Sequence, residues 1–160
     1  MPEPDWDVRA LRFTDHKPLA AFQCANPGEP WTQVVEDRIR SDLYKAWVQR
    51  GENGPDLSVY IVEGQTGSLL GVVACIAEWN GTNFGQIPLL GVDPDHRRQG
   101  IATVLKQAAM DSLARSGCPG VVSQVHESNL PMQGVNRLFE AQTEQDPQAK
   151  DYLLTVVRFE

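Results

Sequence analysis

The segment from residue 97 to residue 103 is the part of the sequence whose residue types and spacing could do chemistry. It follows an apolar run that ends in Val92, Asp93 and Pro94, and it opens a stretch with helical spacing. The first N–H groups of a helix have no intrahelical partner, and with the helix dipole they attract phosphate oxygens. Gly100 lets the backbone approach a bulky ligand because it has no Cβ. The segment therefore predicts a site for an anionic ligand of the kind that carries a pyrophosphate. A plain strand-to-helix turn is the alternative.

The spacing of this segment is neither that of a P-loop nor that of the dinucleotide-binding GxGxxG motif. It resembles the [QR]xxGx[GA] signature of the GNAT superfamily of N-acetyltransferases, which holds the pyrophosphate of coenzyme A. Residues 129–139 are also similar to the N-x-x-M-x-x-V-N-x-x-L-G-F stretch of that superfamily, although the final glycine is absent. The resemblance covers about residues 57–139.

The resemblance implies acetyl-CoA as co-substrate, held by one loop and by two strands that splay apart. The loop residues are Arg97, Arg98, Gln99, Gly100, Ile101, Ala102 and Thr103. In the gap between the strands, the backbone of Leu90, Gly91 and Val92 would contact the pantetheine arm and face the thioester oxygen. Gly91 within a strand also indicates a bulge or a close approach. Asn129 resembles an asparagine that touches the arm, or it is an N-cap. Asn136 resembles a second such residue, or it is an exposed helix residue.

The residues that usually supply proton transfer in this superfamily are missing. Attack on the thioester needs a neutral amine, and many members use a strand glutamate as the base. Gln86 and Pro88 occupy the matching positions here, so Glu78 is the first candidate base and could act through a water. It could equally be a solvated charge at a strand end. His126 and Glu127 are second candidates. The last predicted helix has no tyrosine to protonate the leaving thiolate.

The resemblance implies acetyl transfer to a primary amine of an unidentified small molecule, peptide or protein. The missing glutamate and tyrosine motivate an alternative, which is an acyl-CoA-binding regulatory module with little or no transferase activity. A homodimer is compatible with the resemblance, but no residue fixes the oligomeric state.

The elements that must position these residues follow from apolar periodicity and turn signals. An antiparallel meander should lead into a strand–helix–strand crossover whose strands are parallel. We therefore expect an α/β domain with the GNAT fold: a mixed, mostly antiparallel sheet with a central splayed parallel pair, flanked by helices. The predicted strands span residues 8–13, 57–62, 69–79, 84–92, 121–125 and 152–159, and the predicted helices span about residues 15–24, 32–49, 100–114 and 132–139.

Composition places limits on the class of protein. The chain has 160 residues, 41% of them hydrophobic and 22% charged, so residues 1–160 suit one globular domain. No apolar run reaches the ~20 residues that span a bilayer, and the acidic start lacks a signal peptide, so we expect a cytoplasmic location and no membrane partner. The net charge of −7 disfavours nucleic acid as a partner. Three dispersed cysteines and three dispersed histidines predict no metal site.

Overall fold

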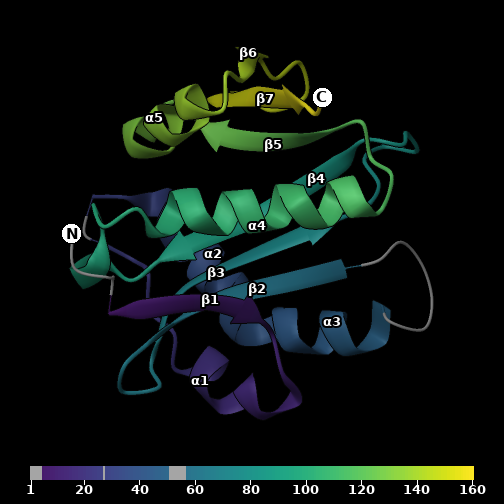
Figure 1. Cartoon of the computed structure of the whole chain (residues 1–160). Coiled ribbons are helices and arrows are strands. Elements are labelled where there is room, and N and C mark those ends of the chain that lie inside the picture. The colour runs from purple at the N-terminus through teal and green to yellow at the C-terminus, as the bar shows by residue number, and fades with distance from the viewer. Residues whose placement is uncertain (1–4, 27, 51–56) are drawn as a thin grey trace.

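The computed structural model describes residues 5–26, 28–50 and 57–160, and it consists of one twisted sheet with helices on both faces (Figure 1). In chain order the elements are β1 (Trp6–Ala10), the 3₁₀ turn η1 (Phe13–Asp15), α1 (His16–Ala20), α2 (Pro30–Arg38), the π-helical segment η2 (Ile39–Leu43), α3 (Tyr44–Arg50), β2 (Leu57–Gly64), β3 (Leu69–Ile76), β4 (Gly85–Val92), the 3₁₀ turn η3 (Pro94–His96), α4 (Ile101–Arg115), β5 (Gly120–His126), α5 (Leu130–Leu138), β6 (Gln142–Gln145) and β7 (Tyr152–Arg158).

The strands form a seven-stranded sheet in the order β1-β2-β3-β4-β5-β7-β6. β4 and β5 pair in parallel, and the other neighbours are antiparallel. The expected mixed sheet with one central parallel pair is therefore confirmed. The helix expected over residues 15–24 is shorter than predicted. The helix expected over residues 32–49 is present as α2, η2 and α3 in succession. The Gly- and Pro-containing segment 51–55, which predicts the end of this helix, lies outside the described residues.

The central parallel pair separates soon after it forms. β4 and β5 pair only at Gly85 with Val121 and at Gln86 with Val122. β5 and β7, by contrast, keep seven residue pairs in register. Beyond Gln86 the two central strands diverge, which Figure 1 shows between the β4 and β5 arrows. This is the splay that the resemblance implied.

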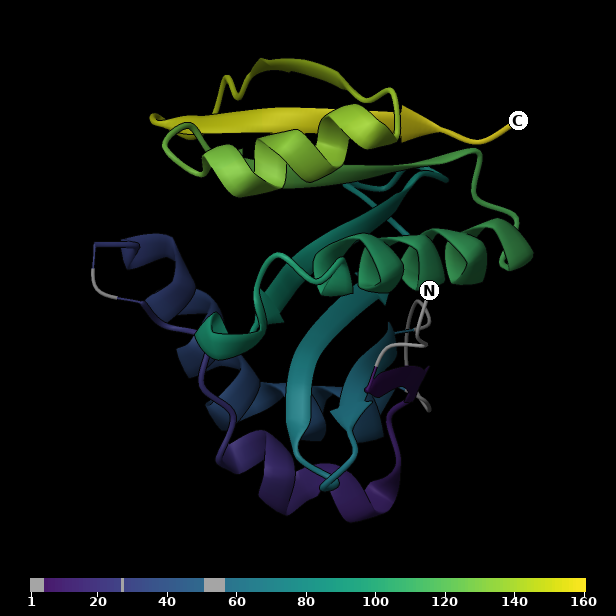
Figure 2. The ribbon, with the colours of Figure 1, turned by 60° about the vertical axis from the view of Figure 1, so that its left-hand side comes forward.

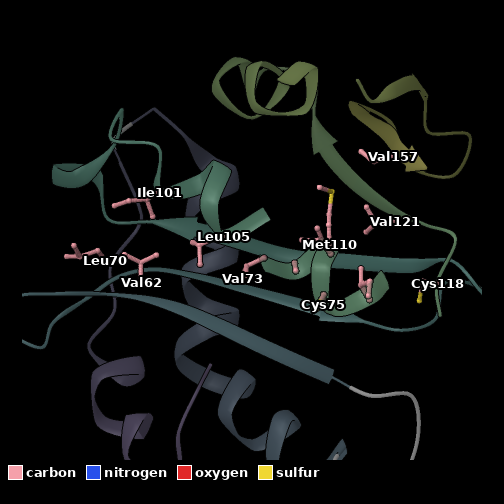
Figure 3. Close-up of a cluster of buried hydrophobic side chains, with 13 residues drawn as sticks. Val62, Leu70, Val73, Cys75, Ile101, Leu105, Met110, Cys118, Val121 and Val157 are labelled. Atoms are coloured by element: carbon pink, nitrogen blue, oxygen red, sulfur yellow. The ribbon is translucent and has the colours of Figure 1, made fainter. Parts of the chain in front are cut away.

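Two hydrophobic clusters hold the helices against opposite faces of the sheet. The cluster under α4 combines Leu105 and Met110 with Val73 of β3 and extends to Val121 and Val157, as Figure 3 shows. The second cluster packs α1, α2 and η2 through Leu19, Ile39 and Leu43, among others, on the other face. Because successive strand residues point to opposite faces, β2 and β3 supply apolar side chains to both clusters.

The helix α5 lies on the same side of the sheet as α4, over β5 and β7 (Figure 2). Pro131 sits in the first turn of α5, where the missing N–H of proline costs no helical hydrogen bond. In the parts of the chain described by the structure, no helix is both long and apolar enough to cross a membrane.

Gly91 marks a close approach and not a bulge. A Cβ placed on Gly91 would lie 3.2 Å from both Cys24 Sγ and Val35 Cγ1, so the N-terminal segment packs directly on β4 there. The bulge of β4 lies earlier in the strand. Ala74 pairs with Leu89 and Ile76 pairs with Gln86, so β4 contains one more residue than β3 between these two pairs.

Candidate active site

The turn between β4 and α4 exposes the N-terminal end of a fifteen-residue helix. Arg98 and Gly100 both have left-handed backbone conformations, with φ of 65° and 83°. Gly100 is the N-cap of α4 and has no side chain with which to cap the first N–H groups. A Cβ at Gly100 would meet no atom within 4 Å, so the space before the helix is open. The predicted phosphate site therefore has open space at the N-terminus of a helix, where N–H groups and the helix dipole attract phosphate oxygens.

Arg97 is already engaged with the N-terminal part of the chain. Its Nη1 pairs with the carboxylate of Glu29, and its Nη2 donates to the carbonyl oxygen of Cys24 at 2.8 Å. Glu29 therefore offsets much of the positive charge that Arg97 would otherwise present to a diphosphate. Arg98 is exposed, and among the described residues its side chain takes part in no ion pair.

The other predicted loop residues differ in what they can offer a ligand. Gln99 is exposed, whereas Ala102 and Thr103 are half-buried. The side chain of Ile101 is 2% exposed and belongs to the core under α4, so only its backbone could contact a ligand.

A pocket of about 340 Å³ lies where β4 and β5 have separated. Of the three β4 residues predicted to contact the pantetheine arm, Leu90 lines this pocket, whereas Gly91 and Val92 are not among its lining residues. α2 and α5 also contribute to its wall. The lining residues used below are Trp31, Arg38, Leu90, Lys106, His126, Asn129 and Tyr152.

A second pocket, of about 400 Å³, adjoins the first and shares Arg38, Ile87 and Pro88 with it. Trp79 lines it from the β3–β4 connection. Asp146 lines it from beyond β6 and is 6% exposed, with its carboxylate accepting hydrogen bonds from Gln124 Nε2 at 2.6 Å and from the Gln148 N–H at 2.9 Å.

Lys106 was not singled out by the sequence, yet it lines the first pocket from α4 while being 2% exposed. Its ammonium donates a hydrogen bond to Oδ1 of Asn136 and lies 5.6 Å from the centroid of the Phe139 ring. Burial lowers the pKa of Lys106 from 10.5 to about 8. Lys106 is spaced from Met110 and Leu113 so that all three lie on the apolar stripe of α4. A lysine on such a stripe is the sequence signal that indicates a buried charge.

The two predicted asparagines have structural partners. Asn136 is 3% exposed, so the interpretation as an exposed helix residue is wrong. Asn129 caps α5, since its Oδ1 accepts from the Met132 N–H at 3.2 Å. It also lines the first pocket, so the capping role and a ligand contact are compatible.

Of the three candidate bases, only His126 lines one of the two pockets. The carboxylate of Glu78 accepts a hydrogen bond from the Gly81 N–H on its own turn, and Glu78 lines neither pocket. Glu127 is exposed. His126 lines the first pocket, but its Nδ1 accepts from the Ser128 N–H at 3.1 Å, so in the neutral ring Nε2 carries the proton. Gln86 and Pro88 do line the second pocket.

Aromatic side chains from distant parts of the chain meet at the first pocket. The His126 ring stacks on Trp31 of α2 with a centroid distance of 5.7 Å, and it forms a T-shaped pair with the Tyr152 ring at a centroid distance of 5.2 Å. Tyr152 comes from β7, not from the last helix, and only the antiparallel pairing of β5 with β7 brings it here.

The family of the chain follows from a comparison with known sequence families. Residues 18–139, which are more than half of the chain, match the acetyltransferase (GNAT) family. The chain belongs to this family, and it is an acetyltransferase by that membership.

Solved structures confirm the fold over nearly the whole chain. The chain is similar to the PaiA N-acetyltransferase of Thermoplasma acidophilum in complex with coenzyme A, with a TM-score of 0.73 and 12% identity, covering 96% of this chain and 99% of that one. It is similar to a GNAT-family acetyltransferase of Staphylococcus aureus, with a TM-score of 0.73 and 9% identity over 97% and 99% of the two chains. Nourseothricin acetyltransferase matches with a TM-score of 0.68 and 14% identity, also over 97% and 99%.

Proposed function

We propose that the protein transfers the acetyl group of acetyl-CoA to a primary amine by direct attack of the amine on the thioester. The acceptor is an amine of a small molecule, peptide or protein. The observation that carries the proposal is the open N-terminal end of α4 at Gly100, which follows a strand that diverges from its parallel neighbour. A phosphate group at the turn and an extended arm in the gap would both find unpaired backbone groups.

The two adjoining pockets support a division of the site between donor and acceptor. The first pocket, between the diverging strands, would hold the thioester end of the donor. The second would hold the acceptor, because Trp79 offers it an aromatic wall and Asp146 a carboxylate. A carboxylate near an amine favours its cationic form during binding, and the net charge of −7 is compatible with attraction of a cation.

The amine must lose a proton before it attacks. Glu78 remains our proposed base, acting through a water, although its bond to the Gly81 N–H favours a capping role. His126 could accept a proton at Nε2 only if the ring gave up its hydrogen bond from Ser128. The usual strand positions, Gln86 and Pro88, cannot serve as bases.

A matched pair of glycine variants tests the donor site. Gly100 and Gly117 flank α4 at its two ends, with φ of 83° and 88°, and neither has an atom within 4 Å of an added Cβ. Alanine at either position should cost about 1 kcal/mol of stability through backbone strain. Gly100→Ala alone should also weaken acetyl-CoA binding, measured by calorimetry, because only Gly100 faces the phosphate site. Equal acetyl-CoA affinities in the two variants would contradict the assignment.

Turnover is tested separately by thiol release from acetyl-CoA with a panel of primary amines. Release that depends on an amine supports transfer. Binding of acetyl-CoA with no release for any amine would instead support the alternative of a regulatory acyl-CoA-binding module.

A further inference from the structure

The first pocket, which we call the donor pocket, contains a buried charged group to which the proposed reaction gives no role. This group is the ammonium of Lys106. Of the positively charged side chains that line this pocket, Arg38 is on α2 and Lys106 is on α4. Lys106 is nearly completely buried, whereas its side chain still reaches the pocket wall. Burying an ammonium group is costly, so its retention here calls for a partner or a task.

The structure supplies only part of what the buried ammonium can bind. A lysine ammonium has three N–H donors, and the described residues provide one hydrogen-bond acceptor, Oδ1 of Asn136. The face of the Phe139 ring adds a weaker electrostatic contact. The other titratable groups facing the pocket are His126 from β5 and Tyr152 from β7, and no carboxylate is among the lining residues described. The described lining residues therefore supply no negative charge to balance the ammonium group of Lys106.

A thioester reaction would supply that negative charge. When an amine attacks the carbonyl carbon, the C–S bond breaks and its electron pair stays on sulfur, so a thiolate forms where the acyl end of the donor lies. We infer that Lys106 is the catalytic acid of the transfer: its ammonium group contacts the departing sulfur and donates a proton to it. This inference rests on the proposed function, because it requires the acyl end to lie in this pocket.

The proton balance of the step is complete. The nitrogen of the neutral amine loses one proton to water, Lys106 gives one proton to sulfur, and Lys106 then takes one proton back from water, so the products are an amide and a free thiol. The lowered pKa of Lys106, about 8, lies close to the ordinary value of a thiol, about 8.5, so the transfer is nearly balanced in energy. Asn136 holds the ammonium group of Lys106 in place through its hydrogen bond, so it acts as a positioning residue.

Binding of coenzyme A itself, the product thiol, provides a test that needs no acceptor. The thiolate absorbs in the ultraviolet, so the pKa of the bound thiol can be titrated in the wild type, Lys106→Met and Lys106→Arg. We expect the thiol to titrate about one pH unit lower in the wild type than in Lys106→Met, which is a tenfold change in its acidity. Lys106→Arg should keep the low thiol pKa but turn over more slowly, because arginine holds a positive charge and does not release its proton.

Three results would overturn the inference. One is an equal thiol pKa in the wild type and in a folded Lys106→Met variant. Another is loss of the shift in Tyr152→Phe but not in Lys106→Met, which would assign the role to the phenol. The third is acetylation of Lys106 on incubation with acetyl-CoA alone, seen by mass spectrometry, which would make it a nucleophile. Failure of the wild type to bind coenzyme A would instead remove the proposed function, and this inference with it.

Discussion

Replacing Lys106 with methionine removes a buried ammonium group while nearly keeping the length of the side chain, so it isolates the energetic consequence of that charge. In the folded chain the pKa is about 8, and in the unfolded chain it returns to about 10.5. The unfolded state therefore binds more protons between these values. Stability is lowered by the full cost below pH 8, and that cost is relieved as the pH rises towards 10.5.

The size of the effect follows from the two pKa values. Their difference corresponds to about 3 kcal/mol at pH 7, and integration predicts a relief of about 2 kcal/mol between pH 7 and pH 9.5. The variant leaves Asn136 without its donor, which costs about 1–3 kcal/mol at every pH. The change with pH is therefore the informative quantity, not the difference at one pH.

Urea unfolding of both proteins at a series of pH values measures this change. We expect the wild type to gain about 2 kcal/mol relative to Lys106→Met between pH 7 and pH 9.5. Lys45→Met, at an exposed lysine of α3, is the matched control for loss of one positive charge. Parallel curves for the wild type and Lys106→Met would show that the ammonium is hydrated in the folded protein and would refute the reasoning.

Three further predictions concern the loop, the cap and the core. Arg97→Ala should lower stability by about 1 kcal/mol by releasing Glu29, whereas Arg98→Ala should leave stability unchanged and weaken coenzyme A binding more, which unfolding curves and calorimetry would show. Asn129→Ala should cost about 1 kcal/mol through loss of the α5 cap, with Asn129→Asp largely restoring stability in thermal unfolding. The three cysteines should not react with a thiol reagent in the native protein, because burial raises the pKa of Cys24 to about 12 and of Cys75 to about 11 and also raises that of Cys118.

Those elements with a strong apolar period could be predicted from the sequence to within a few residues. The helical spacing of Ile101, Val104, Leu105 and Ala108 predicts α4, and Ile101 and Leu105 belong to the core cluster that this helix shares with β3. β6 could not be predicted, since Gln142–Gln145 are all exposed and carry no apolar alternation. Its position is set by pairing with β7, which is a tertiary contact.

The site could be predicted where it depends on backbone and only partly where it depends on side chains. Gly100 was identified because a strand-to-helix turn with a glycine has a local signature. The pairing of Arg97 with Glu29 could not be predicted from the sequence, because 68 residues separate the two in the chain. Lys106 and Tyr152 reach the first pocket only through the packing of α4 and the pairing of β7, so the sequence does not show that the two side chains line the same pocket.

The early separation of β4 and β5 gives the sheet two edges in its interior. Beyond Gln86 and Val122, the facing backbone groups of these strands do not pair with each other in the described structure. Amide protons exchange with solvent fastest where backbone hydrogen bonds are missing or exposed. The backbone amide protons at the centre of this sheet should therefore exchange with solvent at rates typical of an edge strand and not of a fully paired central strand. A strand-like molecule lying in the gap would slow exchange on both strands at once, so exchange rates along residues 87–92 and 123–126 would report its presence amide by amide.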